Sequence, residues 1–127
     1  MIAQIDIDGT IDKAPEFFKW LTKSLKRDGH KVLIVTSRTT SPENDRETAR
    51  EIKKYGVVYD RLILSPNIGD LDAKRFPPDM RPAHKLYIYK LFVAEDNAVD
   101  TLFDDCGITT ELFRKYLPNV KVFKVLS

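Results

Sequence analysis

The chain has 127 residues, the size of one ordinary globular domain. Hydrophobic residues make up 43% and charged residues 31% of it, a balance that lets a chain bury a core without disulfides. The net charge of +2 is too small to indicate a nucleic-acid-binding protein by itself. A single cysteine, Cys106, excludes a disulfide framework and a multi-cysteine zinc site. We therefore expect one domain over residues 1–127.

Two further features bear on location. No apolar run approaches the roughly 20 residues that span a bilayer. The opening residues, MIAQIDIDGT, lack the basic segment and long apolar stretch of a secretory signal. The sequence thus predicts a cytoplasmic protein with no membrane partner, and it does not predict an oligomeric state.

The first half of the chain alternates between strand and helix patterns. Ile2–Ile7 is short and rich in isoleucine and ends at Asp8-Gly9, which favours a strand. A helix is predicted from Pro15 to Gly29, because Pro15 suits a first helical turn and large apolar side chains recur at helical spacing. The next predicted elements are a buried strand at 31–35, a helix at 42–54 capped by Ser41, and a strand at 61–64.

The second half begins with an irregular stretch. Residues 65–82 hold four of the seven prolines and show no period, which predicts a long loop. The elements predicted after this loop are a short helix at 83–89, a strand at 91–94, a helix at 99–105, a helix that starts at Thr109 or Thr110 and ends before Pro118, and a strand at 120–125. Alternating strands and helices predict an α/β fold, a three-layer, doubly wound and mostly parallel sheet.

Polar residues that suit phosphate chemistry follow three of these strands. They are Asp6-Ile7-Asp8-Gly9-Thr10, Thr36-Ser37-Arg38 and Glu95-Asp96. Ligands of such folds bind at the carboxyl ends of the strands, so these groups are expected to meet. Asp6 and Asp8 are two residues apart and face one side, where they repel each other unless a cation lies between them. An oxygen-rich site of this kind suits magnesium rather than zinc.

These residues resemble the motifs of the haloacid dehalogenase (HAD) superfamily. Residues 6–10 are similar to its first motif, D-x-D-G-T, and Thr36 matches the hydroxyl residue of the second. Lys85 matches the basic residue of the third motif, and Glu95-Asp96 with Asp100 resembles the acidic fourth. The resemblance runs from Ile2 to about Gly107 and implies a Rossmann-like HAD core.

The resemblance implies a phosphatase mechanism with assigned residues. Asp6 would be the nucleophile that forms an aspartyl-phosphate, and Asp8 the general acid and base. Thr36 would hydrogen-bond a phosphoryl oxygen, and Lys85 would neutralise charge on the phosphoryl group and Asp6. Thr10 would contact substrate. The implied function is a magnesium-dependent phosphomonoester hydrolase.

The fourth motif departs from the family's usual Asp-Asp, or Gly-Asp with a further Asp. The implied magnesium ligands are Asp6, the backbone carbonyl of Asp8, and Asp96 or Glu95. Asp96 is favoured as the direct ligand, with Glu95 in or near the outer shell, and the choice stays open. The same departure leaves a second hypothesis, a weak or inactive HAD-fold protein that binds phosphate or a partner.

The spacing of the motifs bears on the substrate. Thr36-Ser37-Arg38 resembles the Ser-Gly-Arg of polynucleotide 3′-phosphatases in the superfamily, where the arginine contacts substrate phosphate, and a guanidinium at Arg38 suits that contact. Neither interval between motifs is long enough for a cap domain, so the resemblance implies an open, capless site. Such a site suits polynucleotide ends, nucleotides or phosphoproteins. The loop at 65–82 is either a substrate-facing lid or a solvated excursion.

Overall fold

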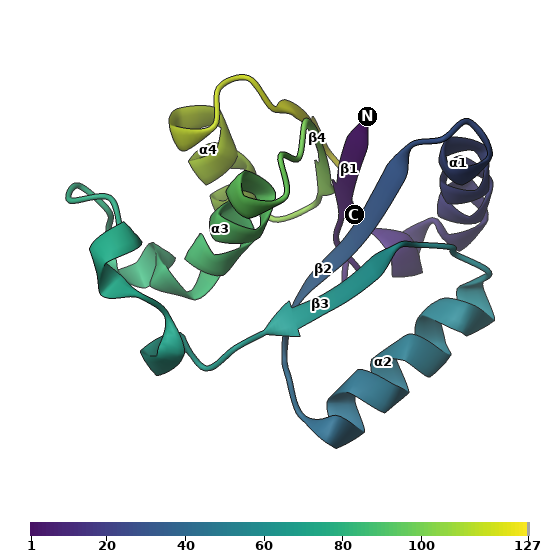
Figure 1. The fold of residues 1–127 in the computed structure, drawn as a ribbon, viewed down its shortest axis with the longest axis horizontal. Helices are drawn as coiled ribbons and strands as arrows, with labels where there is room; N and C mark the ends of the chain where they lie inside the picture. Colours follow the sequence, from purple (N-terminus) through teal and green to yellow (C-terminus); the bar gives the residue numbers. More distant parts are fainter. Residues whose placement is uncertain (127) are drawn as a thin grey trace.

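The computed structural model describes residues 1–126, which form a five-stranded parallel sheet covered by helices on both faces (Figure 1). The strands are β1 (Ile2–Ile5), β2 (Lys31–Thr39), β3 (Arg61–Ser65), β4 (Thr101–Asp104) and β5 (Lys121–Lys124). The helices are α1 (Pro15–Arg27), α2 (Pro42–Tyr55), α3 (Ile88–Asp96) and α4 (Gly107–Tyr116). The strand order is β3-β2-β1-β4-β5. The predicted α/β, Rossmann-like fold class is confirmed, and residues 1–126 contain no cap domain.

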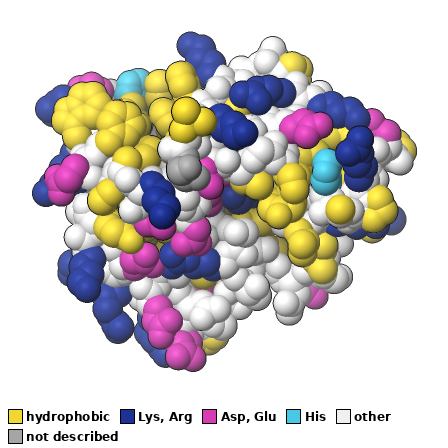
Figure 2. Space-filling view, turned by 180° about the vertical axis from the view of Figure 1, so that it is seen from behind, with side chains coloured by type: hydrophobic (Ala, Val, Ile, Leu, Met, Phe, Trp, Pro, Cys, Tyr) yellow, Lys and Arg dark blue, Asp and Glu magenta, His cyan; other side chains and the backbone are white. Residues whose placement is uncertain are grey.

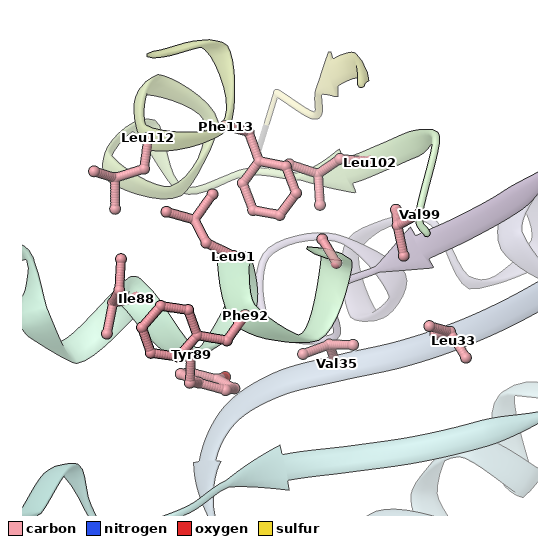
Figure 3. Close-up of a cluster of buried hydrophobic side chains, with 11 residues drawn as sticks. Leu33, Val35, Ile88, Tyr89, Leu91, Phe92, Val99, Leu102, Leu112 and Phe113 are labelled. Carbon is pink, nitrogen blue, oxygen red and sulfur yellow. The ribbon is translucent and has the colours of Figure 1, made fainter. Parts of the chain in front are cut away.

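Two hydrophobic clusters lie on opposite faces of this sheet. On one face, Ile5 and Ile34 pack with Phe18 of α1 and Ile52 of α2. On the other face, side chains of β2 and β4 pack with α3 and α4, as Figure 3 shows. Because β1 has a neighbouring strand on each side and helices above and below, its side chains from Ala3 to Ile5 are fully buried.

Local sequence explains how α2 begins and ends. The Ser41 hydroxyl accepts a hydrogen bond from the backbone N–H of Asn44 at 2.9 Å, and Pro42 occupies the first helical position. The helix ends at Gly56, whose φ of +76° places it in the left-handed region that glycine adopts without strain. The cap at Ser41 that the sequence predicted is confirmed.

The interval from 83 to 105 differs from the sequence prediction. Leu91–Ala94, predicted as a strand, lies inside α3, and β4 occupies Thr101–Asp104 within the predicted helix at 99–105. Both predictions were wrong for one reason. Helix α3 is apolar on nearly all sides because it is buried between β2 and α4, and an apolar run of four residues does not distinguish a buried helix from a buried strand (Figure 3).

The predicted loop at 65–82 contains two single-turn 3-10 helices, η2 (Ile68–Asp70) and η3 (Ala73–Arg75). The next 3-10 helix, η4 (Pro82–Tyr87), continues directly into α3, where the sequence predicted one short helix at 83–89. Several large apolar side chains are exposed across residues 1–126, and Figure 2 shows such side chains gathered among Lys and Arg on one face. Within the same residues, no helix has the length and apolar character to cross a bilayer.

Candidate active site

Strand β2 bulges where the sequence predicted phosphate-binding residues. Val35 pairs with Ile63, and Thr39 pairs with Ser65. Between these two pairs β2 has three residues, whereas β3 has one. The extra residues belong to the segment 36–38. Bulges bend a strand and re-aim its side chains, and here the bulge turns Thr36-Ser37-Arg38 out of the regular ladder at the carboxyl end of the sheet. The backbone carbonyl of Thr36 accepts a hydrogen bond from the Tyr89 hydroxyl.

Asp6 lies at the end of the central strand and is almost completely buried, with 5% of its surface exposed. Its backbone N–H donates to the carbonyl of Phe103 in β4 at 3.0 Å, which continues the pairing of β1 with β4. Lys90 Nζ lies 3.2 Å from Asp6 Oδ1 and 2.8 Å from Asp104 Oδ2. The buried ammonium of Lys90, which lies on α3, therefore bridges two carboxylates. Asp6 follows β1, and Asp104 ends the neighbouring strand β4.

The charges of this group shift one another's titration. Burial raises the pKa of Asp6 to about 7, because the positive charge of Lys90 offsets the loss of water only in part and the negative charge of Asp104 adds to the rise. Burial alone would lower the pKa of Lys90, but the two carboxylates raise it above its ordinary value. Lys90 therefore stays charged, while the ionised form of Asp6 is energetically unfavourable at this buried position.

Asp105 completes an acidic cluster with Asp6 and Asp104. One carboxylate oxygen from each of the three lies within 4.8 Å of the others. The Thr10 hydroxyl donates to Asp105 Oδ1 at 3.3 Å, and Asp104 Oδ1 accepts from the backbone N–H of Cys106 at 2.9 Å. Three residues with oxygen ligands, close together and partly buried, could bind a metal ion.

The charge of this cluster fits a divalent cation. Three carboxylates and the single ammonium of Lys90 leave two negative charges without a partner, which is the charge that one divalent cation would balance. Gly9 makes the close approach of Asp105 possible: a Cβ at Gly9 would lie 2.0 Å from Asp105 Oδ2. Gly9 also has a φ of +83°, which side chains rarely tolerate.

A second ionic group lies beside this cluster. Arg38 donates to both oxygens of Asp8, with Nε at 3.0 Å and Nη2 at 2.8 Å, and its Nη1 donates to Glu51 of α2 at 2.6 Å. The Arg38 hydrogen bonds hold the pKa of Asp8 below its usual value, against the opposing effect of its partial burial. The same guanidinium lowers the pKa of Glu51. Asp8 is therefore a well-paired carboxylate in this structure.

The structure brings most of the predicted site residues to one edge of the sheet. These are Asp6, Asp8, Thr10, Thr36 and Arg38. Lys85 is not at Asp6; it is exposed on η4, with its Nζ 5.7 Å from the ring centre of Phe76.

Glu95 and Asp96 are also separated from the cluster. They end α3, just before β4 begins, and therefore lie at the amino edge of the parallel sheet, opposite Asp6. Both lie near Arg75, whose guanidinium donates to the two oxygens of Asp96 at 2.9 and 3.1 Å. Their expected place depended on the strand that the structure shows to be a helix.

Sequence reasoning missed Lys90, Asp104 and Asp105, although two patterns point to them. Asp104-Asp105 is an adjacent acidic pair that follows the β-prone run Thr101–Phe103. Lys90 is a lysine inside the apolar segment 88–94, where a charged side chain is costly unless it has a partner. Assigning the strand to 101–104 instead of 91–94 would have placed both at the sheet edge.

No profile of a known protein family matches the chain, and no curated protein matches its sequence. Several solved structures share its fold, and two of them are chains of Pnkp1/Rnl/Hen1 complexes. A chain of the Pnkp1/Rnl/Hen1 complex gives a TM-score of 0.67 at 20% identity over 98% of this chain and 45% of that one. A chain of the Pnkp1/Rnl/Hen1 RNA repair complex gives 0.67 at 19% identity over 98% of this chain and 42% of that one. This likeness shows a shared fold. The chain spans less than half the length of either.

Proposed function

We propose that this chain is a magnesium-dependent phosphomonoester hydrolase of the HAD type, which works through an aspartyl-phosphate on Asp6. The observation that carries the proposal is the buried Asp6 carboxylate, held by Lys90 beside Asp104 and Asp105 at the carboxyl end of the central strand. A nucleophile and its charge partners are expected at this edge in parallel α/β folds.

The proposed magnesium ligands are the carboxylates of Asp6, Asp104 and Asp105, with the backbone carbonyl of Asp8. They replace the set with Glu95 and Asp96 that the sequence favoured. A bound Mg²⁺ would screen the negative charge of a phosphoryl group as the carboxylate approaches it. Lys90 takes the charge-neutralising role that the sequence assigned to Lys85, because its ammonium contacts Asp6 directly.

The remaining roles follow from the contacts of each side chain. Asp6 attacks phosphorus, a bond forms between its carboxylate oxygen and phosphorus, and the ester P–O bond breaks. Once the substrate has displaced Arg38 and Asp8 has taken up a proton, Asp8 gives that proton to the leaving oxygen; it then takes one from the water that hydrolyses the aspartyl-phosphate, which frees Asp6 and phosphate. Thr36 and Arg38 bind phosphoryl oxygens. Arg38 donates hydrogen bonds to both oxygens of Asp8. The substrate phosphate must therefore replace Asp8 as an acceptor of these hydrogen bonds before Asp8 can act.

Two observations support a nucleic-acid end or a nucleotide as substrate. The described residues include no cap domain, so the site is open to a large substrate. Two structures that share the fold are chains of a Pnkp1/Rnl/Hen1 complex, one of which is named as an RNA repair complex. The second hypothesis, an inactive binding protein, rested on Glu95, which is absent from the acidic cluster; nothing else at the site favours it.

The test is phosphate release from a panel of substrates with and without Mg²⁺. The panel holds para-nitrophenyl phosphate, nucleoside monophosphates, a 3′-phosphorylated oligonucleotide and a phosphopeptide. We expect release that requires Mg²⁺ and disappears in Asp6→Asn, while Asp28→Asn, an exposed change at the end of α1, leaves it intact. Absence of release from every substrate by folded protein would reject the proposed activity.

A further inference from the structure

A pocket of about 410 Å³ lies beside the candidate active site, within the size range of small-ligand sites. Its walls come from the end of β2, the segment after β3, and η4. Six residues of its lining matter here: Ser37, Ser65, Asn67, Ile68, Lys85 and Leu86. None of them has been given a role in the proposed hydrolysis.

The pocket and the candidate active site share two chain segments. The bulged end of β2 places Ser37 in the pocket wall, between Thr36 and Arg38 of the candidate site. The continuous segment from η4 to α3 places Lys85 in the pocket and Lys90 on Asp6. Four residues of 3-10 and α-helix lie between the two lysines, so their backbone positions are about 8–10 Å apart along the helix axis. A ligand in the pocket would therefore lie along the same edge of the sheet as a phosphoryl group at Asp6.

The side chains that line the pocket offer three kinds of contact. Ile68 and Leu86 are 42% and 62% exposed, and both line the pocket, where apolar surface can cover the face of a ring. The Asn67 amide and the Ser37 hydroxyl can hydrogen-bond polar groups at the edge of that ring. Lys85 forms no salt bridge with any residue in 1–126, so its ammonium is available for an anion.

We propose that this pocket binds the nucleoside that carries the phosphate attacked by Asp6, and that Lys85 binds a second phosphate of the same nucleotide. The attack rests on the proposed function; the binding of a nucleoside rests on the pocket alone. The apolar walls match the face of a flat heterocycle. The hydroxyl and amide groups match its polar edges and the sugar, and the ammonium matches a further anionic group. The site would then prefer a nucleotide with phosphates on both sides, such as the end of a polynucleotide, over a simple monophosphate.

The binding test uses adenosine 3′,5′-bisphosphate and adenosine 3′-phosphate as probes of the ¹⁵N-labelled full chain. We expect both to shift the backbone amides of Ser65, Asn67 and Lys85, with tighter binding of the bisphosphate. Lys85→Met should weaken the bisphosphate about fivefold, the loss of one partly exposed ionic contact, and should leave the monophosphate unchanged. Lys74→Met, an exposed lysine on η3 outside the pocket lining, is the matched control and should change neither. Shifts confined to other surfaces, or equal weakening by both variants, would overturn the proposal.

A kinetic test separates this proposal from the proposed function. In the active protein, Lys85→Met and Asn67→Ala should lower kcat/KM for the bisphosphate about fivefold and leave para-nitrophenyl phosphate unaffected. Amide shifts at the pocket without any turnover would keep the pocket and reject the phosphatase. Turnover with no effect of either variant on the two nucleotides would keep the phosphatase and reject the pocket.

Discussion

Replacing Asp6 by asparagine removes a charge from the most buried part of the candidate site with little change in side-chain size. In the metal-free protein we expect this substitution to stabilise the fold at neutral and alkaline pH. The reason is that burial raises the folded-state pKa of Asp6 from 3.8 to about 7, so ionised Asp6 disfavours the folded state. Asparagine cannot ionise, and Lys90 keeps Asp104 as its partner.

The sign and size of the effect follow from proton linkage. Below pH 3.8 the carboxyl is protonated in both states and Asp6 adds no pH dependence. Between pH 3.8 and 7 the folded state holds the proton that the unfolded state has lost, so the free energy of unfolding falls as the pH rises. At about 1.4 kcal/mol for each pKa unit, the full loss is about 4 kcal/mol above pH 7. The advantage of Asp6→Asn should therefore be about 2–3 kcal/mol larger at pH 8 than at pH 5.

Urea unfolding in the presence of a chelator, at a series of pH values, measures this difference. Asp28→Asn controls for the general effect of removing a carboxylate and should show no comparable trend. Saturating Mg²⁺ at pH 8 should stabilise the natural protein more than Asp6→Asn, because the ion would compensate the charge that only the natural protein carries. An advantage that stays constant from pH 5 to pH 8 would refute the reasoning that Asp6 ionises at an energetic cost.

Three further substitutions test neighbouring parts of the site. Lys90→Met leaves two buried carboxylates without their cation and should lower the free energy of unfolding by about 3–5 kcal/mol in urea, with partial recovery on adding Mg²⁺. Gly9→Ala should lower the free energy of unfolding by about 1–2 kcal/mol, because alanine disfavours the backbone conformation of Gly9. Its Cβ would also displace Asp105, so the substitution should reduce the rise in melting temperature that Mg²⁺ produces. An unchanged rise would contradict this. Arg38→Met should raise the pKa of Asp8 in a carbon-13 titration of the metal-free protein, because the arginine hydrogen bonds lower that pKa. An unchanged pKa of Asp8 would show that these hydrogen bonds do not lower it.

Much of the fold could be predicted from local patterns. The strand at Ile2, the proline at the start of α1 and the cap at Ser41 all reflect preferences that act within a few residues. The parallel arrangement followed from the alternation of strands and helices. That the chain forms one domain over 1–127 stays a prediction.

The acidic half of the site could not be predicted by the same means. Whether residues 91–94 form a strand or a buried helix depends on what covers them, and α4 and β2 are distant in sequence. An error of one element moved the expected acidic pair from Asp104-Asp105 to Glu95-Asp96 and the expected lysine from Lys90 to Lys85. Asp6 and Arg38 were correctly expected at one sheet edge because β1 and β2 were assigned close to their positions in the structure, although β2 extends to Thr39 and contains Arg38.

The position of β1 in the middle of the sheet has a consequence for the order of folding. β1 pairs with β2, the next strand along the chain, through a crossover that contains α1. Its other neighbour, β4, begins nearly a hundred residues later, with Ala3 opposite Thr101. Contacts this distant close large loops and form late. During synthesis, the nascent chain therefore carries Asp6 on an unpaired strand edge until Asp104 and Asp105 emerge from the ribosome. The three carboxylates of the acidic cluster can therefore come together only after β4 has been synthesised, and a chain interrupted before β4 would lack Asp104 and Asp105.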